Sequence, residues 1–207
     1  MQMKKKNTSI INIDNSFLGE FQVASFWNAK RLLLESHQHF QRKLFPTSTF
    51  LSISAIEEMG KYYLCRVMAI RNKKGDLTQQ HISNLRQHPP KQLNSFLPPF
   101  PFEKKKEISQ NISRFWELVA DNKLMDIRNN CLYVDIDLKN IKILSPSSSI
   151  GEHDAQYFLE TAYEIILLQM QSSLKSLDCE ISFHIIFTKE IPFFQENLDQ
   201  LRNKNLS

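Results

Sequence analysis

Hydrophobic residues recur at helical spacing along most of the chain, in long segments separated by short polar or proline-containing stretches. This periodicity predicts long helices over residues 20–45, 49–72, 104–122 and 151–177, and a shorter helical segment over 77–87. Only four glycines and eight prolines occur in 207 residues, which favours long helices over a fold with many turns. The expected fold class is therefore mainly α, a helical bundle.

Two segments depart from the helical period and predict β structure. Apolar residues within 134–144 flank Lys139 and Asn140, which is typical of a short β-hairpin or flap. Within 179–187 apolar residues alternate strictly with polar ones, which predicts a strand that could pair with the hairpin. A short helix is expected around 194–201.

These elements divide the chain into three parts. Residues 1–18 form an N-terminal arm without firm predicted structure, 19–178 the helical bundle, and 179–207 an extension with the strand and the short helix. Prolines interleaved with phenylalanines in 96–102 indicate an extended connector that packs on the bundle rather than a polyproline ligand. The length of 207 residues fits a single domain with a substantial core.

The helix over 49–72 is apolar on all sides, which is typical of a central helix, yet it carries Glu57, Glu58 and Lys61. Burying an unpaired charge costs several kcal/mol, so these groups must pair or face a water-filled cleft. One interpretation is an i,i+4 pair of Glu57 and Lys61 on a partly solvated edge. The other is that the helix lines a polar site. Gly60 costs about 1 kcal/mol relative to Ala in mid-helix, which indicates a close backbone approach there.

A second polar stretch, residues 126–137 (DIRNNCLYVDID), follows the end of a predicted helix. Arg128 can bind phosphate bidentately, Asn129 can hold a phosphate or ribose oxygen, and Tyr133 can donate a proton or stack on a base. This set suits RNA. The alternative is structural: Arg128 pairs with one of the two helix glutamates to close the core, and Tyr133 is ordinary packing.

Charge and cysteine content narrow the class of protein. The formal charge is +4, and lysine runs at 4–6 and 104–106 permit a polyanionic partner without requiring one. Cys65, Cys131 and Cys179 are an odd number and far apart, so they predict neither a disulfide framework nor a zinc site. No apolar run is long enough for a signal peptide or a membrane span, so we expect a cytoplasmic protein without a membrane partner.

Three motifs carry a family resemblance: SISAIEEMGKYYL at 52–64, HPPK at 88–91 and RNNCLYVD at 128–135. In this order and spacing they resemble the AbiV-type abortive infection family, a branch of the HEPN superfamily, over about residues 20–177. The resemblance implies a HEPN-like helical bundle that forms a homodimer and acts in bacterial anti-phage defence by halting growth or translation. Many HEPN proteins are metal-independent ribonucleases in which an arginine and a histidine meet across the dimer.

Arg128 matches the catalytic arginine of the superfamily, and Asn129 matches the polar residue that follows it. The family pattern places a histidine beyond the arginine with four to six residues between them, where this chain has Tyr133, Val134 and Asp135. His88, beside the two prolines, could instead enter the site from another segment or from the other subunit.

The enzymatic hypothesis assigns catalysis to Arg128, Asn129, Tyr133, Glu57 and Lys61. Arg128 would stabilise the transition state, Glu57 and Lys61 would orient the phosphate, and Tyr133 or His88 would move protons. Supporting or RNA-binding roles are expected for a second set, namely Glu58, His88, Lys91 and Asp135.

The partners expected are RNA, a second copy of the chain, and a phage-encoded activator or a component of the host translation machinery; DNA, metal ions and cofactors are not expected. Residues 96–102 and 179–187 are candidate partner contacts. The competing hypothesis is a non-catalytic interaction module, in which the same charged residues form a structural network and toxicity comes from binding a phage or host component.

Overall fold

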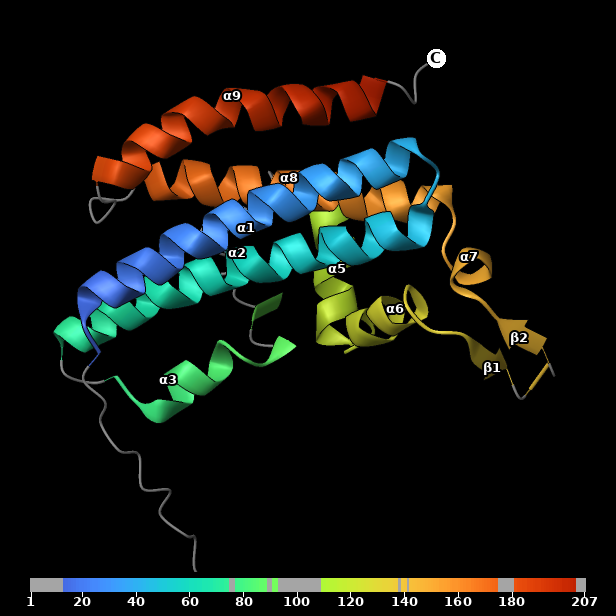
Figure 1. Cartoon of the computed structure of the whole chain (residues 1–207), viewed down its shortest axis with the longest axis horizontal. Coiled ribbons are helices and arrows are strands. Elements are labelled where there is room, and N and C mark those ends of the chain that lie inside the picture. Colours follow the sequence, from blue (N-terminus) through green and yellow to red (C-terminus); the bar gives the residue numbers. More distant parts are fainter. Residues whose placement is uncertain are drawn as a thin grey trace, which may run out of the picture.

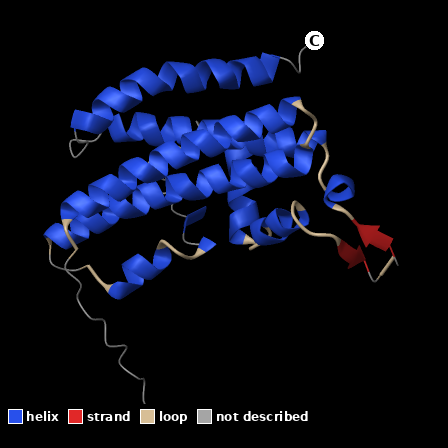
Figure 2. Cartoon of the chain, in the orientation of Figure 1, coloured by secondary structure: helices blue, strands red, loops and turns tan. Residues whose placement is uncertain are grey.

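The computed structural model describes residues 13–74, 77–88, 91–92, 109–137, 139–140, 142–174 and 181–203. Four long helices lie side by side and form the body of the molecule (Figure 1). They are α1 (Asn15–Gln41), α2 (Phe45–Lys73), α8 (Glu152–Leu174) and α9 (Ile181–Asn203). Shorter helices lie against this body, namely α3 (Gln79–Asn84), α5 (Gln110–Ala120), α6 (Leu124–Asn130) and α7 (Pro146–Ser149). The prediction of a mainly α bundle is confirmed (Figure 2).

Helices α1 and α2 form an antiparallel pair joined by a tight turn in which Lys43 has a φ of 61°. Pro46 lies in the first turn of α2, where its missing N–H leaves no helical hydrogen bond unmade. The helix predicted over 49–72 begins four residues earlier, at Phe45, and Thr49 is buried inside it.

The core joins all four long helices. The rings of Phe26 on α1 and Tyr62 on α2 lie 5.1 and 5.8 Å from the ring of Phe187 on α9. Tyr163 on α8 is also fully buried and donates or accepts a 2.9 Å hydrogen bond with Nδ1 of His37. Because aromatic side chains bury large areas, these contacts anchor α9 in the core of the bundle.

The prediction of a strand over 179–187 is wrong, since the described part of this segment, from residue 181 onward, belongs to α9. Phe183 and Phe187 are buried, whereas Ile185 between them is 52% exposed. The apolar side chains that face the core follow a helical period over a longer window, namely Phe183, Phe187, Phe194, Leu198 and Leu201. The short helix expected around 194–201 is the second half of α9.

The predicted β-hairpin is confirmed. Strand β1 (Asp135–Asp137) pairs antiparallel with β2 (Lys142–Leu144), with Ile136 opposite Ile143. In the turn, the carboxylate of Asp137 accepts hydrogen bonds from the backbone N–H groups of residues 139 and 140 at 3.0 and 3.1 Å. The hairpin projects from one end of the bundle, beyond α6 and α7 (Figure 1).

The N-terminal end of the bundle is set by Asp14, whose carboxylate accepts a 3.0 Å hydrogen bond from the backbone N–H of Ser16 and caps α1. Residues 1–12 of the expected arm and the connector 96–102 lie outside the described residues. Among the described helices, none is both long and apolar enough to span a lipid bilayer.

Candidate functional site

The site lies along one side of α2, where Phe50, Ser54, Glu57 and Lys61 follow each other at intervals of three or four residues. Two segments face this side. Arg128 on α6 contacts it at Phe50, and His88, Lys91 and Gln92 contact it at Glu57. The polar groups of α2 therefore face other parts of the protein, as a site-lining central helix requires.

Glu57 is the centre of a hydrogen-bonded cluster and is only 4% exposed. Its Oε2 lies 2.7 Å from Nδ1 of His88, and its Oε1 accepts a 2.7 Å hydrogen bond from Nε2 of Gln92. Nζ of Lys91 lies 3.7 Å from Oε2. One short segment thus supplies two hydrogen bonds and a positive charge to a buried carboxylate, which would otherwise cost several kcal/mol.

Lys91 is itself buried, with 6% of the residue exposed. Desolvation lowers the pKa of its ammonium group, and the nearby Glu57 carboxylate opposes this effect. The positive charges of Lys61 and Arg128 lower the same pKa further, and Glu58 raises it. Arg128 is therefore close enough to the Glu57 cluster to act on it electrostatically.

Gly60 allows this segment to approach α2. A Cβ atom built on Gly60 would lie 1.8 Å from the backbone oxygen of Lys91. No side chain fits in that space, so the expected close backbone approach is confirmed.

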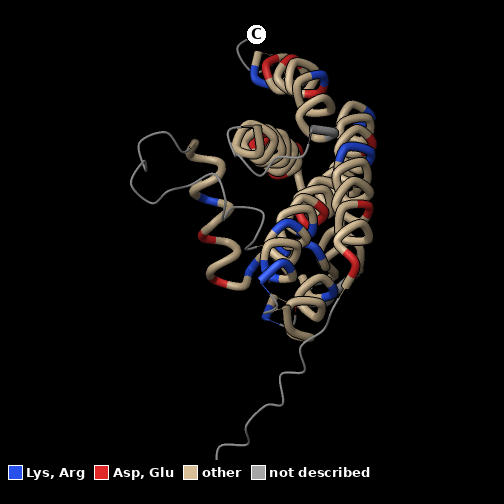
Figure 3. Tube along the Cα trace, turned by 90° about the vertical axis from the view of Figure 1, so that its left-hand side faces the viewer, with Lys and Arg blue, Asp and Glu red and all other residues tan. Residues whose placement is uncertain are grey.

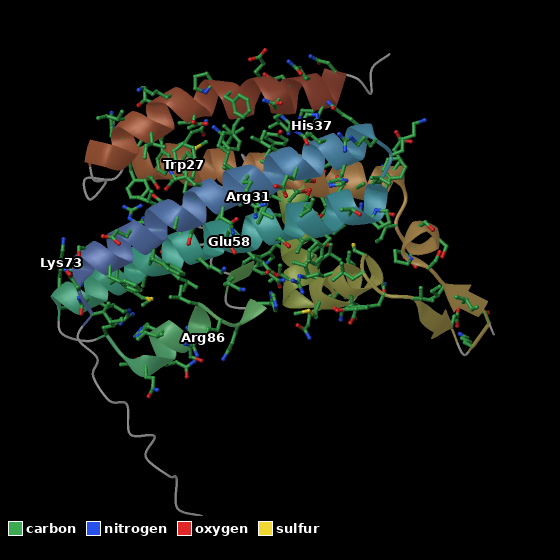
Figure 4. The ribbon with its side chains drawn as sticks, in the orientation of Figure 1. Trp27, Arg31, His37, Glu58, Lys73 and Arg86 are labelled. Atoms are coloured by element: carbon green, nitrogen blue, oxygen red, sulfur yellow. The ribbon has the colours of Figure 1, made fainter. Side chains whose placement is uncertain are left out.

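The expected pair of Glu57 and Lys61 does not form. Lys61 instead donates to the carboxylate of Glu58, three residues earlier, and both side chains are about four-fifths buried, with 21% and 14% of their surface exposed. Glu58 lies near the middle of α2 (Figure 4). The interpretation as an i,i+4 pair is wrong because the Glu57 carboxylate is already bound by His88, Lys91 and Gln92.

Arg128 lies on α6 with its guanidinium carbon 4.8 Å from the ring centre of Phe50, a cation–π contact. Its Nε is buried and has no hydrogen-bond partner among the described residues. Over the same residues no ion pair joins Arg128 to Glu57 or Glu58. The interpretation that Arg128 closes the core by pairing with a helix glutamate is therefore wrong.

Asn129 and Tyr133 lie at the C-terminal end of α6. The backbone N–H of Tyr133 donates a 3.0 Å hydrogen bond to the backbone oxygen of Asn129, which holds the tyrosine just beyond the helix. Tyr133 is 64% exposed, so its interpretation as ordinary packing is wrong. Asp135 begins β1, and its side chain lies outside what the structure describes.

Comparison with known protein families assigns this chain to a family. The family model HEPN_AbiV, described as AbiV, matches residues 17–167. This chain belongs to the AbiV family. No curated protein and no solved structure matches it. The AbiV match spans α1 to most of α8, including Glu57, His88 and Arg128, whereas α9 lies beyond it.

In this AbiV-family protein the positions where the superfamily histidine is expected contain Tyr133 and Val134, both well exposed. The two thiols that the structure describes offer no alternative nucleophile. Cys65 and Cys131 are buried, and desolvation raises the pKa of each to about 12. Among the described residues, no three His, Cys, Asp or Glu side chains cluster as metal ligands would.

Two residues of the site were missed by sequence reasoning. Phe50, the surface on which Arg128 rests, was read only as core, although it lies seven residues before Glu57 on the same side of α2. Gln92 was not singled out, although it follows the HPPK motif directly and hydrogen-bonds Glu57. Its position directly after that motif was the feature of the sequence that could have identified it.

Proposed function

We propose that this AbiV-family protein is an abortive infection effector that cleaves RNA, with Arg128 as the group that binds the reacting phosphate. The observation that carries this proposal is where the Arg128 side chain lies and which groups it contacts. Its guanidinium group rests on Phe50 while its buried Nε–H has no protein partner among the described residues. An arginine held against an aromatic ring keeps its guanidinium group in one place, and the paired terminal N–H groups of a guanidinium are suited to a phosphate.

The chemistry proposed is transesterification within the RNA strand. The 2′-oxygen of a ribose forms a bond to the adjacent phosphorus, the bond from phosphorus to the 5′-oxygen breaks, and the 2′-hydroxyl proton goes to a base. Negative charge builds up on the phosphorane oxygens as this happens. A preorganised guanidinium group stabilises that charge without reorganisation, and one such donor contributes about 100- to 1,000-fold in rate.

The neighbouring residues divide into two roles. Asn129 and Tyr133 are exposed beside Arg128, so an amide contact to the sugar–phosphate backbone and stacking of a base on the phenol ring are open to them. Glu57, Glu58 and Lys61 are engaged with protein groups, so we assign them to holding the site rather than to contacting RNA.

The charge distribution supports a local rather than a general polyanion site. Basic and acidic residues are interspersed along the helices (Figure 3). RNA binding would therefore depend on Arg128 and the residues exposed beside it more than on an extended basic face.

A second candidate function is a non-catalytic interaction module. The observation that favours it is an exposed apolar surface at the end of α6 and on the hairpin, formed by Leu132, Tyr133, Val134 and Ile143. Exposed apolar patches are typical of protein interfaces. The occupants in this case are a second copy of the chain, a phage-encoded activator or a host translation component.

RNA integrity in bacteria that express the protein, with and without phage, tests the proposal. Wild-type protein is expected to produce discrete RNA fragments, and Arg128→Ala to abolish them without lowering the melting temperature. The matched control is Arg31→Ala, because Arg31 on α1 is 58% exposed and its hydrogen bonds within the described residues go to Glu35 at 2.7 Å and Asn28 at 2.9 Å, both outside the site. Growth arrest with intact RNA would overturn the ribonuclease proposal and favour the interaction module.

A further inference from the structure

We infer that His88 is the proton-accepting residue of this site and that Glu57 is its positioning residue. This inference rests on the proposed ribonuclease function. It supplies the group that the superfamily pattern lacks after Arg128, from a different segment of the chain. Its substrate group is the 2′-hydroxyl of RNA.

The first step of the argument is the location of the imidazole proton. Nδ1 of His88 lies 2.7 Å from Oε2 of Glu57, and an ionised carboxylate can only accept a hydrogen bond. Nδ1 therefore carries the proton, and in the neutral ring Nε2 has a free lone pair. The His88 side chain is 32% exposed, whereas the Glu57 side chain is 5% exposed. The imidazole thus points one nitrogen at a buried orienting carboxylate while about a third of the His88 side chain remains exposed, a pairing like that of acid–base dyads of hydrolases.

The second step is that Glu57 cannot turn away from His88. Its other oxygen accepts the hydrogen bond from Gln92, and Lys91 lies 3.7 Å from the oxygen that contacts His88. The backbone of Lys91 is seated directly on Gly60. His88, Lys91 and Gln92 are therefore held on α2 by backbone contact as well as by hydrogen bonds, which is the support that a catalytic side chain needs.

The third step is the position of His88 relative to Arg128. Glu57 follows Phe50 by seven residues, which is about 10 Å along a helix and returns to the same side. Arg128 lies over Phe50, and its charge reaches Lys91 beside Glu57. The charged group in contact with His88 is Glu57, and the charges that act on Lys91, three residues after His88, are Glu57, Glu58 and Lys61 from α2 and Arg128 from α6. Base and phosphate ligand thus lie along one side of a single helix.

The fourth step is the choice between His88 and Tyr133. An imidazole takes up and releases protons within the physiological pH range, whereas a phenol does so only in a strongly perturbed environment. Tyr133 is largely exposed, and no described side chain hydrogen-bonds to its hydroxyl. His88 has both the buried orienting group and the suitable chemistry.

With His88 as the base, each bond and each proton of the transesterification can be followed. Nε2 of His88 takes the 2′-hydroxyl proton as the 2′-oxygen bonds to phosphorus. The electron pair of the breaking bond leaves with the 5′-oxygen, which takes a proton from water. The products are a 2′,3′-cyclic phosphate and a 5′-hydroxyl end, and an RNA with deoxyribose at the cleavage position is not cleaved.

The test compares purified wild-type protein with His88→Gln, Glu57→Gln and Arg128→Ala on an RNA substrate that the wild type cleaves in cells. His88→Gln is expected to lower the cleavage rate by at least about 100-fold, the range of general acid–base catalysis. The matched control is His184→Gln, because His184 is exposed on α9 and should leave the rate unchanged. If His88→Gln cleaves like the wild type while Arg128→Ala does not, His88 is not the base and the proposed function stands. If no variant and no wild-type protein cleaves, both the function and this inference fail.

A second measurement distinguishes a role of Glu57 in orienting His88 from a role in stabilising the fold. Nitrogen-15 NMR of the imidazole ring reports which nitrogen carries the proton, and in the wild type the Nδ1–H form should dominate for neutral His88. A carboxamide at position 57 can present an N–H to Nδ1, so Glu57→Gln should shift His88 toward the Nε2–H form and slow cleavage in the fraction of protein that remains folded. An unchanged tautomer with unchanged cleavage would overturn the role of Glu57. If His88→Gln lowers the melting temperature, the tautomer of His88 in the Glu57→Gln variant still tests whether Glu57 orients the imidazole.

Discussion

The backbone oxygen of Lys91 occupies the space that a side chain on Gly60 would need, with only 1.8 Å to a Cβ atom built there. This contact seats residues 91 and 92 on the middle of α2. It explains a glycine in the centre of a long helix, where alanine would otherwise be favoured by about 1 kcal/mol. It also places His88 and Lys91 against Glu57.

Gly60→Ala should therefore destabilise the protein although it improves helix propensity. We expect a loss of about 1–3 kcal/mol in the free energy of unfolding, as for overpacked sites. Gly19→Ala is the matched control, because a Cβ atom on Gly19 in α1 meets nothing within 4 Å and should stabilise by up to about 1 kcal/mol. Urea denaturation of both variants checks this, and a stabilised Gly60→Ala would refute the close approach.

Phe187 should be essential to the core. Its ring packs against Phe26 and Tyr62 and is fully buried, so Phe187→Ala is expected to cost about 3–5 kcal/mol. Ile185 lies two residues earlier and is half exposed, so Ile185→Ala should cost far less. Thermal or urea unfolding compares the two. Comparable losses would be the result expected of a strand, in which residues two apart lie on the same face, and would contradict the helical assignment of α9.

Glu164 should make stability depend on pH. Its carboxylate on α8 is buried between Ser109 and Arg202, which both hydrogen-bond to it. Burial raises its pKa above the ordinary 4.5, and the bonds from Ser109 and Arg202 oppose this only in part. Because the folded-state pKa is the higher one, the contribution of Glu164 to stability is fully present below about pH 4.5 and is lost as pH rises through the folded-state pKa.

Glu164→Gln should remove this contribution. As pH rises from below 4.5 toward neutral, the melting temperature of Glu164→Gln should rise relative to that of the wild type. Differential scanning calorimetry across this range measures it. A difference that moves in favour of the wild type with rising pH would show that Arg202 outweighs desolvation.

Tyr133 is expected to bind rather than to transfer protons. Tyr133→Phe keeps the ring and should cleave RNA at close to the wild-type rate. Tyr133→Ala removes a stacking surface worth about 1–3 kcal/mol per base, so KM should rise by roughly tenfold or more. Steady-state kinetics on a short RNA checks both variants, and loss of kcat in Tyr133→Phe would assign the proton transfer to the phenol hydroxyl.

The long helices were predictable because each carries its apolar residues at helical period over many turns. The strand prediction failed because a window of nine residues with alternating apolar positions fits either structure. Phe183, Phe187 and Phe194 decide for a helix only when the window is extended. The hairpin was predictable because polar turn residues separate two short apolar runs.

The residues that form the site were predictable from the sequence, but the contacts among them were not. Charges within an apolar helix identified Glu57 and Lys61, and the HPPK motif identified His88 and Lys91. Local spacing alone, however, favours a bond between Glu57 and Lys61. The actual partner of Glu57, His88, is 31 residues away in the sequence and arrives through tertiary packing on Gly60. Periodicity carries no information on such a contact.

The most direct test of the central claim is to map new RNA ends in phage-infected cells that carry the wild-type protein or Arg128→Ala at equal protein levels. Cleavage that depends on Arg128 and leaves 2′,3′-cyclic phosphate ends is the result predicted here. Growth arrest by both proteins with no new RNA ends would contradict it, and would make the cluster around Arg128 a scaffold for binding a partner.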